Sequence, residues 1–441
     1  MLTASILPPN VNRIVNEYPR IFRVRQKFNC DAIADIPSVV EEQLISLRLS
    51  DRIKSGESVA ITAGSRGIRN IATVITSIVQ HVTNLNAIPF IVPAMGSHGG
   101  GTVKGQLEVL ESYGITEANC GCEIRAGMET KIVCQANEGF PVHFDRHAAD
   151  ADHVIVCNRI KPHTDFTGDI QSGLMKMMLI GLGKHEGAKI YHKAIQDHSF
   201  GQIVRSVAGE VVKRCRIAGG IAIVENALDE TEIIQAVLPE EFESHEKRLL
   251  QTAIGKMAQL PFDEAHVLLV DQIGKNISGT GMDTNVVGRK YTDHAAVEGE
   301  TPQIKRIVIR GLTPETHGNG CGIGMCEFAR TAAVEQVDFH KTAMNCITSN
   351  HVTAGMIPLH YPTDREILDQ ALVTIGLTKP IDAKLMWIRN TLDLEYLECS
   401  EAYFPVAQKR NDLEVMTEPC ELNFDASGNL VVPQSGDNGA S

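Results

Sequence analysis

The stretch from Ser58 to Gly101 reads SVAITAGSRGIRNIATVITSIVQHVTNLNAIPFIVPAMGSHGGG. An apolar run suited to a strand, an amphipathic run suited to a helix and a second apolar run follow one another with short turns between them. Near-continuous apolar strands on either side of a helix are typical of a parallel sheet that is covered on both faces. We therefore expect a strand–helix–strand unit with glycine-rich turns at its strand ends.

The same alternation continues on both sides of this stretch, and a chain of 441 residues is too long for one ordinary core. A charged helical segment over residues 239–261 precedes a restart of the pattern. The sequence therefore predicts two α/β domains with mainly parallel sheets, residues 1–260 and 261–441, with the active site in the cleft between them. The second domain is expected to end in a short polar tail. The remaining expected helices cover residues 36–49 and 102–114, and the remaining strands cover residues 153–160, 265–274 and 305–312.

Composition narrows the class of protein. The chain is 43% hydrophobic and 22% charged, as globular proteins are, and its formal charge of −13 argues against nucleic acid or an anionic membrane as a partner. It has no apolar run of about 18 residues, and its first residues do not resemble a signal peptide, so a cytoplasmic protein is expected. Its eleven cysteines are expected to be mostly reduced, although Cys120/Cys122 and Cys321/Cys326 leave metal binding open.

Candidate functional groups lie just past three expected strands, where α/β folds place their sites. Arg66 and Arg69 precede a helix whose first N–H groups could bind a phosphate or carboxylate. His98 lies among glycines that would let a ligand approach, and His163 follows the strand at 153–160. Each has a plainer alternative, namely an ordinary turn with a solvated arginine, or a structural histidine.

Two further side chains flank a glycine-broken apolar run. Lys176 and His192 are 16 residues apart, which on one straight helix would separate them by roughly 24 Å and place them on different faces. Glycines at 181, 183 and 187 would permit a reversal that brings both side chains to one pocket. The alternative is a surface lysine and a histidine on a helix face.

A polar, glycine-rich loop follows the expected strand at 265–274. Gln272 and Lys275 offer an amide and an ammonium group that could hold a carboxylate and a hydroxyl. A loop at a domain junction is a preferred place for a pocket. The many polar groups of this loop could equally satisfy its own turns.

Taken in order, these residues resemble the nickel-dependent lactate racemase family, whose members invert 2-hydroxy acids with a nickel-pincer nucleotide. The sequence GSH with His98 and the sequence KPH with His163 match the two catalytic histidines of the family. Lys176 and His192 match, at the family's spacing, the lysine that holds the cofactor covalently and the histidine that binds nickel. The resemblance covers residues from about 60 to 290.

The resemblance also implies roles for the remaining candidates. Gln272 and Lys275 match a substrate-binding pair, and Arg66 matches an arginine after an early strand that would hold the substrate carboxylate. Ser65 and Arg66 are expected to contact the cofactor. The first domain would then bind the cofactor, the second would bind the substrate, and other proteins would make the cofactor. A homo-oligomer is a further possibility.

The substrate class follows only in outline. Ala63 replaces an acidic residue that is often seen three positions before the arginine, and the interval from His163 to Lys176 is about three residues longer than in the lactate enzymes. The polar loop after Lys275 favours a dicarboxylic or polyhydroxy acid, such as an aldonate, over plain lactate. The alternatives are a non-catalytic hydroxy-acid-binding protein and a nicotinamide-type oxidoreductase, although no GxGxxG motif opens a helix after the first strands.

Overall fold

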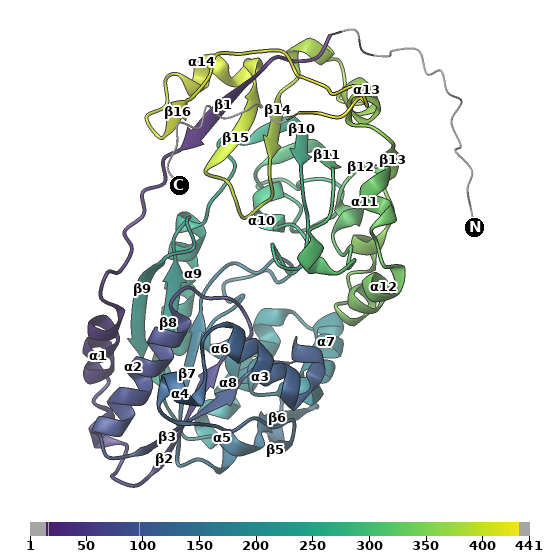
Figure 1. The fold of residues 1–441 in the computed structure, drawn as a ribbon. Helices are drawn as coiled ribbons and strands as arrows, with labels where there is room; N and C mark the ends of the chain where they lie inside the picture. Colours follow the sequence, from purple (N-terminus) through teal and green to yellow (C-terminus); the bar gives the residue numbers. More distant parts are fainter. Residues whose placement is uncertain (1–14, 16, 97, 432–441) are drawn as a thin grey trace. The chain divides into compact units, whose positions relative to one another are not determined.

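The computed structural model describes residues 15, 17–96 and 98–431, and the chain divides into two compact units (Figure 1). One comprises residues 29–257, here called the continuous unit. The other, the split unit, combines the residues before 29 with those from 258 onward. The expected polar tail from 432 and the first 14 residues, on which the signal-peptide argument depended, lie outside the described residues.

The split unit corrects the expectation that residues 1–260 form one domain. Strand β1 (Ile21–Gln26) lies between β15 and β16 in the sheet of the split unit and pairs antiparallel with both. Ile21, Phe22 and Val24 are buried there. The misassignment has a physical reason, because a single six-residue strand carries no signal for which sheet it joins.

The continuous unit is built on a six-stranded sheet with the order β4-β3-β2-β7-β8-β9. All neighbouring strands are parallel except β8 and β9, which form an antiparallel pair at one edge. A separate antiparallel hairpin, β5 with β6, lies outside this sheet. The strands are β2 (Ser58–Ala63), β3 (Ile88–Pro93), β4 (Glu123–Ile124), β5 (Thr130–Gln135), β6 (Pro141–Asp145), β7 (His153–Arg159), β8 (Ile217–Glu225) and β9 (Thr231–Val237).

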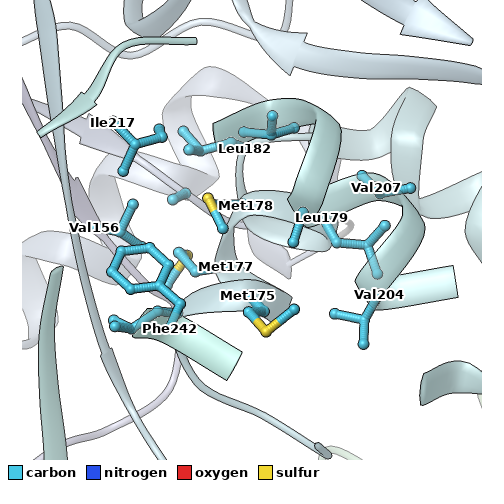
Figure 2. Close-up of a cluster of buried hydrophobic side chains, with 14 of the residues drawn as sticks. Val156, Met175, Met177, Met178, Leu179, Leu182, Val204, Val207, Ile217 and Phe242 are labelled. Atoms are coloured by element: carbon cyan, nitrogen blue, oxygen red, sulfur yellow. The ribbon is translucent and has the colours of Figure 1, made fainter. Parts of the chain in front are cut away.

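Two apolar cores cover the two faces of this sheet, as expected for a buried parallel sheet. Alternate strand residues supply them, so Val59 and Ile61 pack with α1 and α2, whereas Ala60 and Val156 face the opposite core. Figure 2 shows that second core, in which the methionine-rich segment around Met178 packs near Val156 and Phe242. The helices are α1 (Ile36–Ser46), α2 (Ile71–Asn84), α3 (Val103–Ser112), α4 (Glu117–Cys120), α5 (Arg146–Asp150), α6 (Leu174–Lys176), a π-helical turn (Met177–Gly181), α7 (Lys184–Asp197), α8 (Phe200–Arg214) and α9 (Phe242–Lys256).

The split unit is built on an eight-stranded mixed sheet with the order β13-β12-β11-β10-β14-β15-β1-β16. Strands are parallel from β13 to β14 and antiparallel from β14 to β16. Apolar residues of α13 pack against buried side chains of β10, β11 and β14. The strands beyond β1 are β10 (Glu264–Val270), β11 (Gln303–Ile309), β12 (Phe328–Arg330), β13 (Leu359–Tyr361), β14 (Leu385–Ile388), β15 (Tyr396–Ser400) and β16 (Leu413–Val415); the helices are α10 (Thr284–Val287), α11 (Thr331–Glu335), α12 (Phe339–Thr348), α13 (Asp364–Val373) and α14 (Phe404–Ala407).

Both units are therefore α/β with mostly parallel strand pairing in the sheets that carry the candidate residues, as the sequence predicted. Within the described residues, no helix combines the length and apolarity that a lipid bilayer would require.

Candidate functional site

Three adjacent parallel strands of the continuous unit bring the candidate residues to one edge of the sheet. Ser65 and Arg66 follow β2, His98 follows its neighbour β3, and His163 follows β7 on the other side of β2. The carboxyl ends of parallel strands share one edge, so these loops lie next to one another. The geometry of the sheet thus accounts for a gathering of residues that are nearly 100 positions apart in the chain.

The first pair at this edge is Ser65 and His98. The hydroxyl of Ser65 makes a hydrogen bond with Nδ1 of His98, and the backbone carbonyl of Ser65 accepts a hydrogen bond of 2.9 Å from the hydroxyl of Tyr113. A hydroxyl can donate or accept, so Ser65 can serve either tautomer of His98. The loop is specific in shape, because a Cβ at Gly99, whose φ is +66°, would lie 2.5 Å from the backbone of Gly105.

His163 is held differently. Its Nδ1 accepts hydrogen bonds from the backbone N–H of Asp165 at 3.0 Å and of Phe166 at 3.1 Å. The backbone N–H of His163 donates to Oε1 of Gln171 at 2.9 Å. The imidazole is stacked on Phe166, with ring centroids 4.1 Å apart and an angle of 11° between the planes. Because Nδ1 is an acceptor twice, the neutral ring carries its proton on Nε2.

Lys176 and His192 belong to one electrostatic cluster. Burial, together with the positive charge of Arg66, lowers the pKa of Lys176 to about 7 against an opposing contribution from Asp165. Burial also lowers the pKa of His192, with a second contribution from Lys176 and again an opposing one from Asp165. The ammonium of Lys176 lies 4.8 Å from the centre of the Phe166 ring. An amine and an imidazole that are both easily deprotonated therefore share one environment.

The turn between Lys176 and His192 differs from the predicted one in the residue that has a positive φ. A positive φ is found at Lys184, the first residue of α7, where it is +53°. It is not found at Gly181, Gly183 or Gly187. The glycines are required for space, since a Cβ at Gly181 would lie 2.3 Å from the sulfur of Met177 and one at Gly183 would lie 2.3 Å from the carbonyl of Leu179. The expectation that the glycines themselves form the reversal was wrong.

Lys184 is held in place by buried partners. Its side chain has no exposed surface, and its Nζ lies 3.0 Å from the equally buried Oδ2 of Asp145. The same ammonium donates to the carbonyl of Pro93 at the end of β3 and lies 3.5 Å from Gln106 Oε1 in α3. The hydrogen bond to Pro93 connects the segment that carries His192 to the strand that leads to His98.

The edge of the sheet is rich in positive charge. Arg66 is exposed, yet the surrounding protein and the nearby Arg159 lower its pKa. Arg159 is paired with Glu225, which also accepts a hydrogen bond of 2.6 Å from the backbone N–H of Arg69. The anion expected beside Arg69 is thus supplied by the protein itself. Arg66 is left as the arginine that can attract a substrate or cofactor anion.

The predicted substrate-binding pair lies in the split unit. Gln272 and Lys275 follow β10, and both are half-buried. The backbone N–H of Lys275 donates to Thr316 Oγ1 at 3.1 Å, and its ammonium donates to the carbonyl of Gly279. Much of the loop's polarity serves its own folding, for example through Thr280 Oγ1, which donates to the carbonyl of Met282 at 2.7 Å. Loop polarity is therefore weaker support for a polyhydroxy substrate than the sequence suggested.

Some residues around the site were not anticipated from sequence. Asp165 and Phe166 lie two and three residues after His163, and an acidic and an aromatic residue so close to a candidate histidine could have been read as its partners. Glu246 interrupts the buried stripe of α9 made by Phe242, Leu249, Leu250 and Ala253, so its helical spacing was an available signal. Across the described part of the chain, no group of three His, Cys, Asp or Glu side chains could hold a metal ion, and Cys321 packs with Cys346 in an apolar cluster.

The fold and this strand-end cluster define an α/β protein with two histidines, an amine and an arginine gathered at the carboxyl edge of a parallel sheet. Residues 20–202 match the family described as lactate racemase N-terminal domain. That range contains Ser65, Arg66, His98, His163, Lys176 and His192. The part of the chain that carries these six residues is therefore similar to the lactate racemase N-terminal domain family, over less than half of the chain's length.

Solved structures give a second comparison. The lactate racemase apoprotein from Thermoanaerobacterium thermosaccharolyticum is 12% identical, with a TM-score of 0.48 over 92% of this chain and 93% of that one. A protein from Thermotoga maritima is also 12% identical, with a TM-score of 0.47 over 73% and 82% of the two chains. Among curated protein sequences, none matches the chain significantly. The likeness to this family rests on the match over residues 20–202.

Proposed function

We propose that the protein is an isomerase, a racemase or epimerase that inverts C2 of a 2-hydroxy acid with the help of a nickel-pincer nucleotide. The observation that carries the proposal is the shared environment of Lys176 and His192, beside Arg66. The sequence resemblance assigns these residues to cofactor attachment, nickel binding and anion binding. Their electrostatics in the fold suit those tasks.

The donor set fits such a cofactor. An amine whose pKa is about 7 is about half neutral near pH 7 and can act as a nucleophile toward a carboxyl-derived group, so Lys176 would hold the cofactor. An imidazole whose pKa is lowered keeps its lone pair for a metal, so His192 would bind nickel. Arg66, with Ser65 nearby, would hold a phosphate or carboxylate. A cofactor that brings its own donors to nickel requires only one ligand from the protein.

The chemistry explains the histidine pair. Hydrogen on C2 of a hydroxy acid is a poor acid beside a charged carboxylate, so a base alone would remove it only with difficulty. When bound, the cofactor supplies an electron-poor carbon that accepts this hydrogen as hydride. The protein must then take the hydroxyl proton and later return one, which is the proposed role of His98 and His163.

The two histidines differ in the tautomer that their hydrogen bonds allow. The hydroxyl of Ser65 can accept a hydrogen bond from Nδ1–H of His98, and in that tautomer Nε2 carries a lone pair that can accept a proton. Neutral His163 instead carries its proton on Nε2, because its Nδ1 accepts two backbone N–H bonds, so its Nε2 presents a donor rather than a lone pair. We infer that the enantiomer whose hydroxyl faces His98 is the one processed faster in a single turnover.

Substrate binding is proposed for three groups. Arg66, Gln272 and Lys275 would hold the carboxylate, and the substrate class is a 2-hydroxy acid, either lactate-like or with further polar groups. The proposed setting is cytoplasmic, with cofactor maturation enzymes as partners.

The deciding experiment is production of the full chain together with cofactor maturation enzymes. Intact mass should show a covalent adduct, metal analysis should show nickel, and both enantiomers of a 2-hydroxy acid should interconvert. Lys176→Ala should lose the adduct, whereas His192→Ala should keep the adduct and lose nickel. An adduct that persists in Lys176→Ala would refute the assignment of this lysine.

The histidine assignment has its own test with the loaded protein. His98→Ala and His163→Ala should each slow interconversion by a factor on the order of 10² or more, because each removes one acid–base group. In single turnovers with each enantiomer, the two variants should show opposite preferences. If both variants preferred the same enantiomer, the two-base assignment would be wrong.

A further inference from the structure

Glu246 is a buried carboxyl group without a place in the proposed chemistry. Its side chain lies on α9, in the apolar stripe between Phe242 and Leu249, and only 1% of the residue is exposed. Burial of a carboxylate away from water is costly unless hydrogen bonds compensate. A hydrophobic residue would fill this position at lower cost, so the carboxyl group requires another explanation.

The explanation lies in the helical segment that carries Lys176. The first N–H groups of a helix have no acceptor within the helix, and the residue before α6 is Gly173, which has no side chain to cap them. Oε1 of Glu246 accepts a hydrogen bond of 2.9 Å from the backbone N–H of Met175. A side chain from a different helix therefore caps the turn whose next residue is Lys176.

Neighbouring residues are shaped around this contact. A Cβ at Gly173 would lie 2.4 Å from Oε1 of Glu246, so only glycine lets the carboxyl group approach. Asn158 of β7 donates from its side chain to the carbonyl of Gly173 at 2.9 Å. The backbone before Lys176 is thus held by two hydrogen bonds. One comes from Asn158 of the sheet to the carbonyl of Gly173, and the other joins the N–H of Met175 to Glu246 of α9.

The packing around the contact is tight as well. A Cβ at Gly220 of β8 would lie 2.6 Å from Leu174 and 2.9 Å from the ring of Phe242. Met175 and Phe242 lie in the same apolar core, which Figure 2 displays. A shift of α9 or of the turn is therefore resisted by the core, and the carboxyl group adds a directional hydrogen bond to this packing.

We propose that Glu246 is a positioning residue that fixes the turn bearing Lys176, so that the amine points into the site. This inference rests on the proposed function in one respect, namely that Lys176 holds the cofactor. Glu246 itself touches neither cofactor nor substrate, and it acts through the backbone of Met175.

The test uses the full chain and three variants. Glu246→Leu places an apolar side chain of similar size in the apolar stripe of α9 and removes the cost of burying a carboxyl group, so this variant should fold without providing an acceptor. Glu246→Gln retains a carbonyl acceptor for Met175. Glu398→Leu is the matched control, because Glu398 is another buried carboxyl group with a raised pKa, located in β15 of the split unit.

Two readouts distinguish this inference from the proposed function. Hydrogen exchange of the Met175 amide should accelerate at least tenfold in Glu246→Leu and stay at the wild-type rate in Glu246→Gln and Glu398→Leu. When maturation enzymes are present, covalent loading at Lys176 should fall at least tenfold in Glu246→Leu alone. Wild-type exchange and wild-type loading in Glu246→Leu would overturn the inference. Accelerated exchange, with no loading even in the wild type, would support positioning and refute the proposed function.

Discussion

Nδ1 of His163 accepts a hydrogen bond from the backbone N–H of Asp165 at 3.0 Å, and the next residue, Phe166, donates a second one. The imidazole is therefore part of the loop's own backbone network as well as a candidate acid–base group. These two tasks use different ring nitrogens, because Nδ1 holds the loop and the proposed acid–base role belongs to Nε2. Substitutions can separate them.

His163→Asn should separate the two tasks, because the amide oxygen of asparagine can take the place of Nδ1 but nothing replaces Nε2. Chemical denaturation should show His163→Ala to be less stable than His163→Asn by about 1–2 kcal/mol, the worth of two modest hydrogen bonds. Interconversion of enantiomers should be lost in both variants. Equal unfolding free energies for the two variants would show that the loop does not depend on Nδ1.

The amine of Lys176 should react unusually fast in protein produced without the maturation enzymes. Its pKa of about 7 means that half of the amine is neutral near pH 7, whereas an ordinary lysine is neutral only above pH 10. Trace acylation followed by mass spectrometry should give a labelling rate at Lys176 that reaches its plateau above about pH 8. The exposed Lys104 of α3 is the internal control, and parallel pH profiles at the two lysines would contradict the prediction.

Glu246 should make the protein less stable as pH rises. Burial raises the pKa of Glu246 to about 8 in the folded state, above the ordinary value of 4.5, so the folded state retains a proton that the unfolded state has released between these pH values. Its contribution is fully present below pH 4.5 and is lost on the way to pH 8, with a limiting slope of about 1.4 kcal/mol per pH unit. Urea titrations of Glu246→Gln should lack this slope, and identical pH dependence in wild type and variant would refute the shift.

The buried pair of Lys184 and Asp145 should show strong coupling. Lys184→Met leaves the carboxylate of Asp145 buried without its partner and should destabilise the fold by roughly 3–5 kcal/mol. Adding Asp145→Asn, which keeps the capping bond to Ala148, should recover much of that loss. Denaturant unfolding of the two single variants and the double variant gives the coupling energy. Additive effects would indicate that the two groups do not interact.

Periodicity was sufficient to predict the elements that build the site. Strands β2, β3 and β7 and helix α2 are long apolar or amphipathic runs, and their ends located Arg66, His98 and His163. Family resemblance, rather than physics, singled out Lys176 and His192. The sequence pattern of this segment alone favoured a surface lysine and a histidine on a helix face.

Other features depended on tertiary contacts that local patterns do not encode. Lys184 adopts a left-handed conformation because buried partners hold its ammonium, and a lysine gives no local signal for positive φ. Glu246 caps a helix 71 residues earlier in the chain. Strand β1 pairs with β15, from which it is separated in the sequence by the whole continuous unit. Such long-range pairings are decided by the assembled core rather than by neighbouring residues.

The placement of β1 has a consequence for how the chain is made. Ile21 pairs with Ser400, and Val24 pairs with both Leu397 and Val415, so this strand must wait for partners that leave the ribosome long after it does. Residues 29–257 are complete long before then and can fold first. During that interval β1 is an unpaired strand with an apolar face, which makes the nascent chain prone to association. A chain that stops before residue 396 would leave β1 permanently without its ladder, whatever the state of the continuous unit.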